Sequence, residues 1–314
     1  MPLNHLLIEN HHQPTQSLET RIFTFLKKRF PLSTEQMQTY DNLYKGFQGE
    51  RKFYHLLKKV FTNPHCIVLY DLLLEINQSL FQIDCLLIFQ KQIYLLEIKN
   101  YEGEFVLKDG GFYTVSSNRQ IRNPIQQLER SKILLEQFLR KNGFSIPIQS
   151  YVVFVNNTFV LYEASVTLPI IFPAQLVKFV HKFNNINYPL LEKQRRLAEC
   201  FIENRISQSP YERIPKYSFD QLKKGVICHK CEKFLSRKNY YKFQCPTCDD
   251  IESISSGIMR SVIEFNTLFP NEKMTTKMIY EWCGRIVSMR GIRKILLRFM
   301  KANGTKNNRI YIFD

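Results

Sequence analysis

Apolar residues recur with helical spacing at the start of the chain and with the spacing of strands after residue 65. Two helices are expected first, over 18–30 and 41–61, and each ends shortly before a proline. The strands expected next cover 66–73, 81–89, 92–100, 105–107 and 112–115. This order predicts an α/β fold in which several strands follow one another through short turns.

A further helix and a buried strand follow this run of strands. The helix covers 124–142, with Leu128, Leu135 and Phe138 on its apolar side. Residues 151–155 are then continuously apolar and rich in valine, which is typical of a strand buried on both faces. We therefore predict a mixed sheet flanked by helices, in a domain that ends near residue 190.

These patterns divide the chain into five parts. An N-terminal helical segment (1–40) precedes the α/β domain (41–190), and a charged helical linker (191–220) follows it. Two small modules come last, one rich in cysteine (221–252) and one helical (256–314). No apolar run approaches the ~20 residues of a membrane-spanning helix, and the first residues lack the basic and then apolar pattern of a secretion signal. We therefore expect a cytoplasmic protein with no membrane partner.

Basic residues exceed acidic residues by 44 to 28, which gives a formal net charge of +16. The excess is concentrated behind residue 220, where 18 Lys and Arg stand against 8 Asp and Glu. Such an excess favours a polyanionic partner, because phosphates that bind cations release their counterions. A soluble basic protein without such a partner has the same composition, so the charge alone leaves both interpretations open.

The clearest candidate chemistry lies on the second and third of the expected strands. Glu97 and Lys99 are two residues apart on one strand and so point to the same face. A turn of two or four residues between the strands pairs positions whose numbers sum to 181, which puts Asp84 opposite Glu97, roughly 5 Å away. A three-residue turn would put Asp84 on the other face, so the strand register decides whether the site exists.

Two carboxylates so close repel each other unless a positive charge lies between them. A hard divalent cation that prefers oxygen ligands, Mg²⁺ or Mn²⁺, meets this need at Asp84 and Glu97. Lys99 is placed to contact the water or the phosphate that this ion holds, which completes the parts needed for phosphodiester hydrolysis. The alternative is a surface ion pair between Glu97 and Lys99 beside an unrelated aspartate.

The order and spacing of several motifs resemble those of a known family. These motifs are Gly49-Glu50 on a helix, Gln82-Ile83-Asp84, Glu97-Ile98-Lys99-Asn100 with Gly103 after it, and Asn123-Pro124 followed by Gln127. Over about residues 41–160 they are similar to the nuclease-related domain (NERD) of the PD-(D/E)xK superfamily, which includes restriction endonucleases. The resemblance implies a restriction-endonuclease-like fold. The proline that names the superfamily is absent before Asp84, a departure that NERD proteins usually share.

The resemblance also implies a role for each motif residue. The two strand carboxylates would bind the catalytic metal, with the Ile98 carbonyl as a third ligand, while Lys99 positions or activates the attacking water. Glu50 would bind a metal or orient its water, and Gln127 would complete the site from the following helix. Apart from the resemblance, Glu50 and Arg51 also suit the solvent-facing side of a helix.

Four of the eight cysteines form a CxxC…CxxC pattern with thirteen residues between the pairs, at Cys228, Cys231, Cys245 and Cys248. Two such knuckles supply the closed tetrahedral site that structural Zn²⁺ prefers, whereas a redox pair would need only two thiols. The loop between them carries Lys238 and Lys242 among aromatic residues. Those aromatic residues suit base stacking beside phosphate contacts, or they form the small core of the module itself.

The last module is expected to hold three short helices and a terminal strand, over 257–269, 275–286, 289–301 and 309–313. Helices followed by a hairpin resemble a winged helix, a common DNA-reading module. The residues of the third helix expected in the core are Ile292, Ile295, Leu296 and Phe299. The residues expected to face nucleic acid, or simply solvent, are Arg290, Arg293, Lys294 and Lys301.

Together these features predict a nuclease that depends on Mg²⁺ or Mn²⁺, holds a structural Zn²⁺ and has DNA rather than RNA as its preferred partner. Two alternatives stay open: a catalytically silent protein that binds nucleic acid and keeps the fold as a scaffold, and a DNA-processing or defence component that is active only with a partner. The complete set of Asp84, Glu97 and Lys99 favours an active enzyme.

Overall fold

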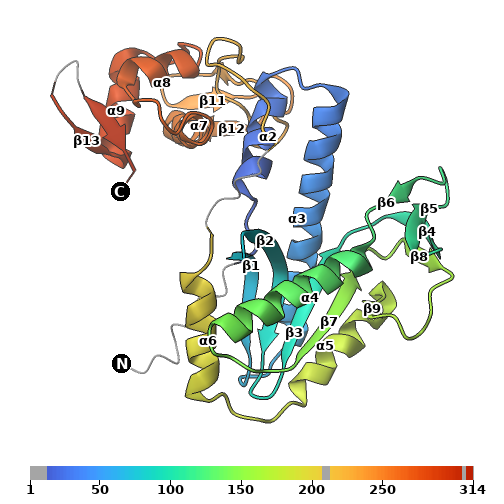
Figure 1. Cartoon of the computed structure of the whole chain (residues 1–314). Coiled ribbons are helices and arrows are strands. Elements are labelled where there is room, and N and C mark those ends of the chain that lie inside the picture. The colour runs from blue at the N-terminus through green and yellow to red at the C-terminus, as the bar shows by residue number, and fades with distance from the viewer. Residues whose placement is uncertain (1–12, 207–212, 306–308, 314) are drawn as a thin grey trace. The chain divides into compact units, whose positions relative to one another are not determined.

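The computed structural model describes residues 13–206, 213–305 and 309–313 (Figure 1). The chain divides into two compact units. The first consists of Met1–Gln16 and Asn42–Tyr211, and the second of Ser17–Asp41 and Glu212–Asp314. In the described ranges, no helix is both long enough and apolar enough to cross a membrane.

A five-stranded mixed sheet forms the centre of the first unit, in the order β1-β2-β3-β7-β9. The first three strands form an antiparallel meander, and β7 and β9 run parallel to β3. Their bounds are Ile67–Ile76, Ser79–Ile88, Ile93–Lys99, Ile148–Phe154 and Ile170–Ile171. Val152 and Val153 on β7 are fully buried in the cores on opposite faces of the sheet, which confirms the strand predicted there.

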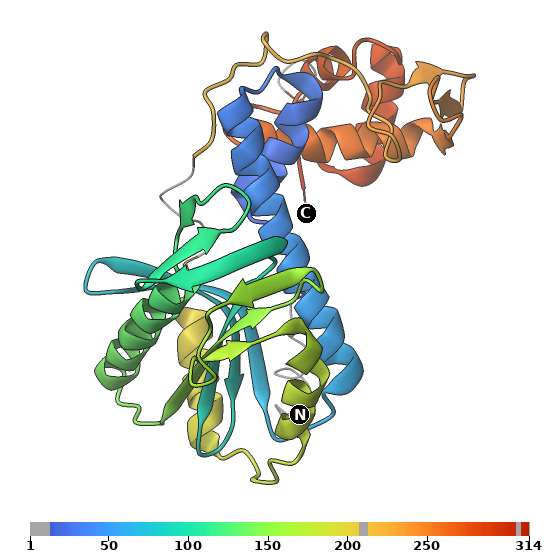
Figure 2. The same ribbon diagram turned by 90° about the vertical axis from the view of Figure 1, so that its right-hand side faces the viewer.

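Helices cover both faces of this sheet (Figures 1 and 2). The apolar sides of α4 (Pro124–Lys141) and α6 (Glu192–Glu203) pack on one face. Those of α3 (Thr34–Val60) and α5 (Leu176–Asn184) pack on the other. Each large side chain buried in these two cores stabilises the unit by roughly 1.5–3 kcal/mol. The unit therefore has three layers, and the predicted mixed sheet between helices is confirmed.

A second sheet, in the order β6-β5-β4-β8, extends the first unit. Its strands, in chain order, are β4 (Gly103–Lys108), β5 (Gly111–Thr114), β6 (Gln120–Ile121) and β8 (Phe159–Tyr162). Asp109 and Gly110 join β4 to β5 with positive φ angles of 51° and 71°, the backbone that a two-residue hairpin turn requires. Phe159 stacks on Phe154 of β7 with ring centroids 3.7 Å apart, so the two sheets share one apolar core.

α6 lies within residues 191–220, which we expected to form a linker, but it packs into the first unit. Leu197, Ala198 and Phe201 are fully buried against the main sheet, with the spacing of one helix face. The charged residues between them hid this apolar stripe at the level of sequence. Residues 207–212 of the expected linker, like residues 1–12 of the expected N-terminal segment, lie outside the described residues.

The second unit combines one N-terminal helix with the two C-terminal modules. Leu26 on α2 (Leu18–Arg29) is buried in the same core as Val262, Phe265 and Leu296. The other helices are α7 (Ile254–Leu268), α8 (Thr276–Trp282) and α9 (Met289–Phe299). The strands are β10 (Ser236–Arg237), β11 (Lys242–Gln244) and β12 (Ile251–Ser253) in one sheet, and β13 (Lys301–Asn303) and β14 (Ile310–Ile312) in another. Three helices followed by a hairpin agree with the C-terminal module predicted from the sequence.

A buried ion pair connects α2 to α7. Arg29 is fully buried, and its Nε and Nη2 donate hydrogen bonds to the two carboxylate oxygens of Glu264 at 2.9 and 2.7 Å. Arg29 also donates to the carbonyls of Lys223 and Gly225, and its guanidinium lies 4.1 Å from the ring of Trp282. Each of the three guanidinium nitrogens therefore donates at least one hydrogen bond. A buried charge is tolerated in a core only when it has such partners.

Replacing Arg29 by Ala is expected to destabilise the second unit by about 3–5 kcal/mol, because Glu264 would keep a buried charge with no partner. Trp282 is the only tryptophan of the chain and lies in this unit, so its fluorescence in a urea titration reports the loss. Lys28→Ala is the matched control. The Lys28 side chain is 16% exposed and pairs with Glu232, which is 42% exposed and also pairs with Lys27. Ion pairs in contact with solvent contribute about 0–1 kcal/mol. Equal losses in both variants would contradict a stabilising role for the buried pair.

Candidate active site

Asp84 and Glu97 lie next to each other on β2 and β3. In the ladder between these strands Cys85 pairs with Leu96 and Ile88 with Ile93, so paired numbers sum to 181 and the predicted register is confirmed. Just beyond the last pair, Asp84 Oδ2 accepts a hydrogen bond of 2.7 Å from the backbone N–H of Ile98. The strand register thus brings both carboxylates to one place at the end of the ladder.

Glu97 is buried, with 3% of its surface exposed, and has two polar partners. Lys99 Nζ and Gln127 Nε2 both donate to Glu97 Oε1, at 2.7 and 2.5 Å. Lys99 also donates to Gln127 Oε1 at 3.2 Å, so the three side chains form a closed ring of hydrogen bonds. Such partners are what a buried carboxylate needs. Because Glu97 is buried, its pair with Lys99 is not the surface ion pair that the sequence left open as an alternative.

The start of α4 brings Gln127 to this ring. Asn123 caps the helix, because its Oδ1 accepts a hydrogen bond of 2.9 Å from the N–H of Ile125, and Pro124 occupies the first helical position. Asn123 Nδ2 also donates to the carbonyl of Gly110 at 3.0 Å, which ties the cap to the β4–β5 turn. The Asn123-Pro124 motif therefore fixes where α4 begins, and with it the position of Gln127 one turn later.

Glu50 reaches the site from α3, on the other face of the sheet. A Cβ atom on the preceding Gly49 would lie 2.7 Å from Cβ of Asn100, so only glycine allows the helix to approach the end of β3 so closely. Asn100 Nδ2 holds the helix there by donating to the carbonyl of Lys45 at 2.9 Å. The Gly49-Glu50 and Asn100 motifs thus act together to bring Glu50 to the strand carboxylates.

Burial and neighbouring charges raise the pKa of two of these carboxyl groups, Glu50 and Asp84. Burial, and then the charge of Asp71, together raise the pKa of Glu50 to about 7, although Lys99 opposes them. Burial, followed by the charges of Glu97 and Glu50, also raises the pKa of Asp84 well above its usual value. Burial alone would lower the pKa of Lys99, but the carboxylates outweigh it and the pKa is raised, so Lys99 is a cation at neutral pH. When all of these carboxyl groups are ionised, the site holds more negative charge than Lys99 alone can balance.

Asp71 is the one acidic neighbour of Glu50 that the sequence did not indicate. In β1 the residues on either side of it, Tyr70 and Leu72, pair with Cys85 and Ile83, so Asp71 lies across from Asp84. Its φ is +50°, and its carboxylate accepts hydrogen bonds from Gln82 at 3.0 Å and from Arg205 at 3.3 Å. The signal was weak, because Asp71 lies in a largely apolar strand that also carries Glu75, and it stands outside the quoted motifs.

We expect Mn²⁺ to stabilise the first unit more at pH 8 than at pH 5.5. The raised pKa of Glu50, about 7, favours its neutral form in the folded chain. The stability gained from neutral Glu50 is fully present below the ordinary pKa of a glutamate and is lost as the pH rises through about 7. Above that pH a bound cation can offset the charge of ionised Glu50. Calorimetric melting with and without Mn²⁺ at each pH measures the stabilisation by the ion. This stabilisation is about 2.7 kcal/mol where Mn²⁺ is in hundredfold excess over its Kd. Glu50→Gln should reduce the pH dependence, and an unchanged dependence would contradict the assignment.

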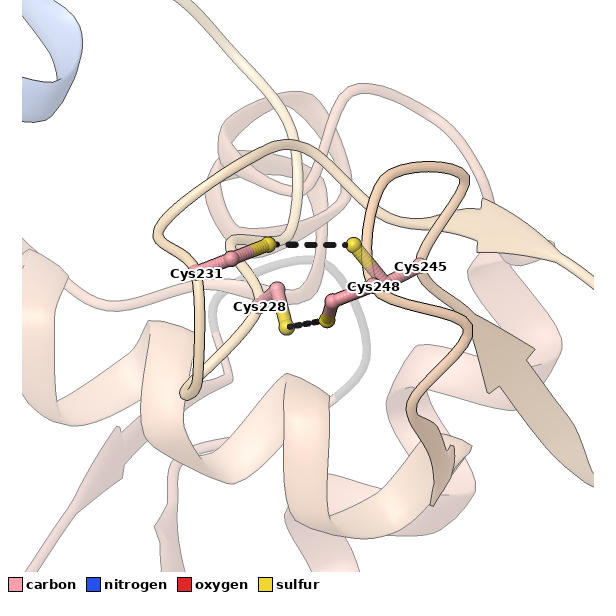
Figure 3. Close-up of side chains that lie close together, drawn as sticks. All are labelled: Cys228, Cys231, Cys245 and Cys248. Atoms are coloured by element: carbon pink, nitrogen blue, oxygen red, sulfur yellow. Dashed lines mark hydrogen bonds between the residues drawn. The ribbon is translucent and has the colours of Figure 1, made fainter.

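The four cysteines predicted to bind Zn²⁺ come together in the second unit. Their sulfur atoms all lie within 4.8 Å of one another, with Cys228 3.7 Å from Cys248 and Cys231 3.3 Å from Cys245 (Figure 3). A tetrahedral site with Zn–S bonds of about 2.3 Å places its sulfurs about 3.8 Å apart. The chemistry and spacing of these thiols therefore fit zinc, and all four are free of disulfides.

The two knuckles have the same backbone geometry. In each, the N–H four residues after the first cysteine donates to the carbonyl of that cysteine, Glu232 to Cys228 and Asp249 to Cys245, both at 3.1 Å. Glu232 and Asp249 have positive φ angles of 62° and 55°. The N–H of Thr247 also points to Cys245 Sγ at 3.4 Å, which suits a thiolate. Two equal turns thus present two sulfurs each from opposite sides.

We predict one Zn²⁺ per chain, measured by elemental analysis of protein purified without added metal. Cys245→Ser should lose this zinc and lower the unfolding midpoint that Trp282 fluorescence reports, because metal binding and folding are coupled in such modules. Cys200→Ser is the control, since Cys200 lies on α6 outside the cluster. Protein that contains no zinc while its thiols are reduced would contradict this assignment.

The basic residues predicted to contact nucleic acid are all exposed. Two lie on the β10–β11 hairpin (Lys238 and Lys242), three on α9 (Arg290, Arg293 and Lys294) and one on β13 (Lys301). Ile292 and Leu296 are buried as expected, with Ile295 packed beside them. The prediction that Phe299 lies in the core is wrong, because this side chain is exposed. α9 ends at Phe299, and Met300 enters the core instead.

A mixed sheet lies between helices, and carboxylates, a lysine and a glutamine gather just beyond the end of the β2–β3 ladder. This architecture is consistent with a nuclease-like fold. Residues 45–155 match the family model of the nuclease-related domain. The match covers 111 of the 314 residues and lies within the first unit. It includes Glu50, Asp84, Glu97, Lys99 and Gln127. No curated protein and no solved structure matched the chain.

Proposed function

We propose that the first unit hydrolyses phosphodiester bonds of nucleic acid, with DNA preferred over RNA, in a reaction that depends on Mg²⁺ or Mn²⁺. One observation carries this proposal: Asp84, Glu97, Lys99, Gln127 and Glu50 converge from β2, β3, α4 and α3. The match to the nuclease-related domain supports the same chemistry.

The donor set fits a hard divalent cation. The hydrogen bonds to Asp84 and Glu97 use Oδ2 and Oε1, so each carboxylate has a second oxygen to offer. Among the described residues, only the four cysteines form a set of three or more candidate ligands close enough to share an ion. The cation would therefore be held by Asp84, Glu97, the Ile98 carbonyl and water, and Glu50 would contact it through water. Mg²⁺ usually keeps several waters in protein sites of this kind.

A bound cation would supply a Lewis acid and lower the pKa of water beside the phosphate. Lys99, as a cation, donates hydrogen bonds to the phosphate or to the attacking water, and stabilises the negative charge that develops there. Gln127 holds Lys99 and Glu97 in place. Glu50, with its pKa of about 7, suits the group that accepts a proton from the attacking water as the water oxygen bonds to phosphorus. The bond from phosphorus to the leaving oxygen breaks in the same step, and that oxygen takes a proton from solvent water.

The proposal is tested with the full chain on single- and double-stranded DNA and RNA, in Mg²⁺, Mn²⁺ or EDTA. We expect cleavage of DNA with either ion and none in EDTA. Cleavage that continues in EDTA would contradict the dependence on metal. If all four substrates stay intact with both ions, the chain is not a nuclease by itself.

A second function, binding nucleic acid without cleaving it, is supported by the charge of the second unit. The exposed cations Arg290, Arg293 and Lys294 lie on one helix of this unit, outside the segment that matches the nuclease-related domain. Gel-shift assays without divalent ions separate the two functions, because binding then persists whether or not the first unit is active.

A further inference from the structure

Two exposed tyrosines stand at the tip of the β10–β11 hairpin in the second unit. Tyr240 is 70% exposed and Tyr241 is 73% exposed. Elsewhere in the described chain, the most exposed Phe, Tyr and Trp side chains are Tyr188 and Phe299, at 48%. The core of the module contains Phe243, which is fully buried. The sequence left open whether the aromatic residues of this loop form the core of the module or are free to stack on bases. Phe243 forms part of the core, whereas Tyr240 and Tyr241 do not.

Hydrogen bonds hold the backbone of this tip. Asn239 Oδ1 accepts bonds from the N–H groups of Tyr241 and Lys242, both at 2.9 Å. The carbonyl of Tyr241 accepts a further bond of 2.9 Å from Ile254, the first residue of α7. A turn closed by an asparagine side chain fixes the backbone that carries both rings. A ligand that binds the rings therefore loses little affinity to the ordering of this loop.

The hairpin that carries the two rings is cationic. The guanidinium of Arg237 lies 5.8 Å from the ring of Tyr240, and Lys238 and Lys242 are exposed on either side of the pair. The sequence from residue 233 to residue 248 has no acidic residue. The rings meet edge to face at 81°, with centroids 5.0 Å apart, so they are not stacked on each other. Aromatic faces beside cations match a ligand that combines flat rings with phosphates.

We propose that Tyr240 and Tyr241 stack on unpaired bases of a nucleic-acid strand while Lys238 and Lys242 contact its phosphates. In a duplex the bases are already stacked on one another, so the tyrosines would select single strands, loops or frayed ends. This inference rests on the proposed binding of nucleic acid by the second unit, but it does not need cleavage. It adds a preference for unpaired substrate that the cations of α9 do not supply.

The test measures binding of the full chain, without divalent ions, to a single-stranded oligonucleotide and to a blunt duplex of the same length. The variants are Tyr240→Leu/Tyr241→Leu, the matched Tyr240→Phe/Tyr241→Phe, and Lys238→Gln/Lys242→Gln, each checked for zinc content. The Leu variant should bind the single strand at least about tenfold more weakly with an unchanged salt dependence, and the Phe variant should bind like the parent. The Lys variant should reduce the slope of log K against log salt by about 1.4, or about 0.7 for each lost phosphate contact.

A strand in which central bases are replaced by abasic sites isolates the stacking itself. If the rings stack on bases, the Leu substitutions and the abasic sites remove the same interaction, so their effects will not add. Additive effects, or equal losses on single strand and duplex, would overturn the proposal. So would a Leu variant that binds single strands like the parent. A chain that binds neither DNA nor RNA in either form would instead remove the proposed nucleic-acid function as a whole.

Discussion

Replacing Asp84 by Asn, Glu97 by Gln or Lys99 by Met is expected to slow cleavage by at least about 10²–10³-fold, the usual cost of removing one group that stabilises charge in the transition state. The two carboxyl variants remove negative charge that the proposed cation needs, and the Lys99 variant removes the donor that we propose to contact the phosphate. Single-turnover assays with enzyme in excess measure the effect, because they report the chemical step apart from product release.

The folded state of these variants separates chemistry from structure. Burial and the charges of Glu97 and Glu50 raise the pKa of Asp84, so its ionised form weakens the metal-free fold as the pH rises. Asn can still accept the hydrogen bond from Ile98. Asp84→Asn should therefore melt, without metal, at or above the temperature of the parent while losing cleavage. Lys108→Met, an exposed residue of β4, is the control and should cleave like the parent. Undiminished cleavage in all three site variants would show that the site is wrong.

Reversing Arg290, Arg293 and Lys294 to Glu is expected to weaken duplex binding by at least on the order of 10²-fold at low salt. These side chains are exposed on α9, so the fold should tolerate the change. Loss of three phosphate contacts should also flatten the slope of log K against log salt by about 2.7, or 0.9 for each contact. The matched control reverses Lys58, Lys178 and Lys193, which are exposed on the first unit and change the net charge equally.

Equal losses in the two triple variants would show that binding follows total charge and not α9. Charge reversal is a cleaner test than deletion of residues 212–314. Ile22 and Leu26 on α2 are buried in the core of the second unit, and Arg29 is paired there with Glu264. A deletion would expose this apolar face and leave Arg29 without its partner, so weaker binding after truncation would not distinguish lost contacts from unfolding.

The sequence predicted the central geometry wherever a local rule determined it. The length of the turn between β2 and β3 left two possible faces for Asp84. The structure has the register in which paired numbers sum to 181, which puts Asp84 on the same face as Glu97. The cysteine spacing predicted the four-cysteine cluster, because each knuckle is a short local turn. Capping by Asn123 and Pro124 explains why the start of α4 was also within reach of prediction, whereas Gln127 was named from the family resemblance.

The features that escaped prediction depend on contacts between segments far apart in the chain. Asp71 joins the site through strand pairing with the Asp84 region and through Arg205, which lies 134 residues away. Arg29 and Glu264 are 235 residues apart, and no periodicity of either helix marks them as partners. Phe299 followed the helical pattern, but α9 ends at this residue and Met300 enters the core in its place. Local spacing gives a residue its face, whereas its neighbours come from the tertiary fold.

The most direct measurement of the central claim records bound Mn²⁺ and DNA cleavage in the same samples. Mn²⁺ is titrated into zinc-loaded protein at pH 8, and bound ion is followed by electron paramagnetic resonance. We predict that cleavage rises in proportion to the occupancy of one Mn²⁺ site, and that Asp84→Asn loses both the site and the cleavage. Cleavage without bound Mn²⁺, or binding by Asp84→Asn as strong as that of the parent, would contradict the account.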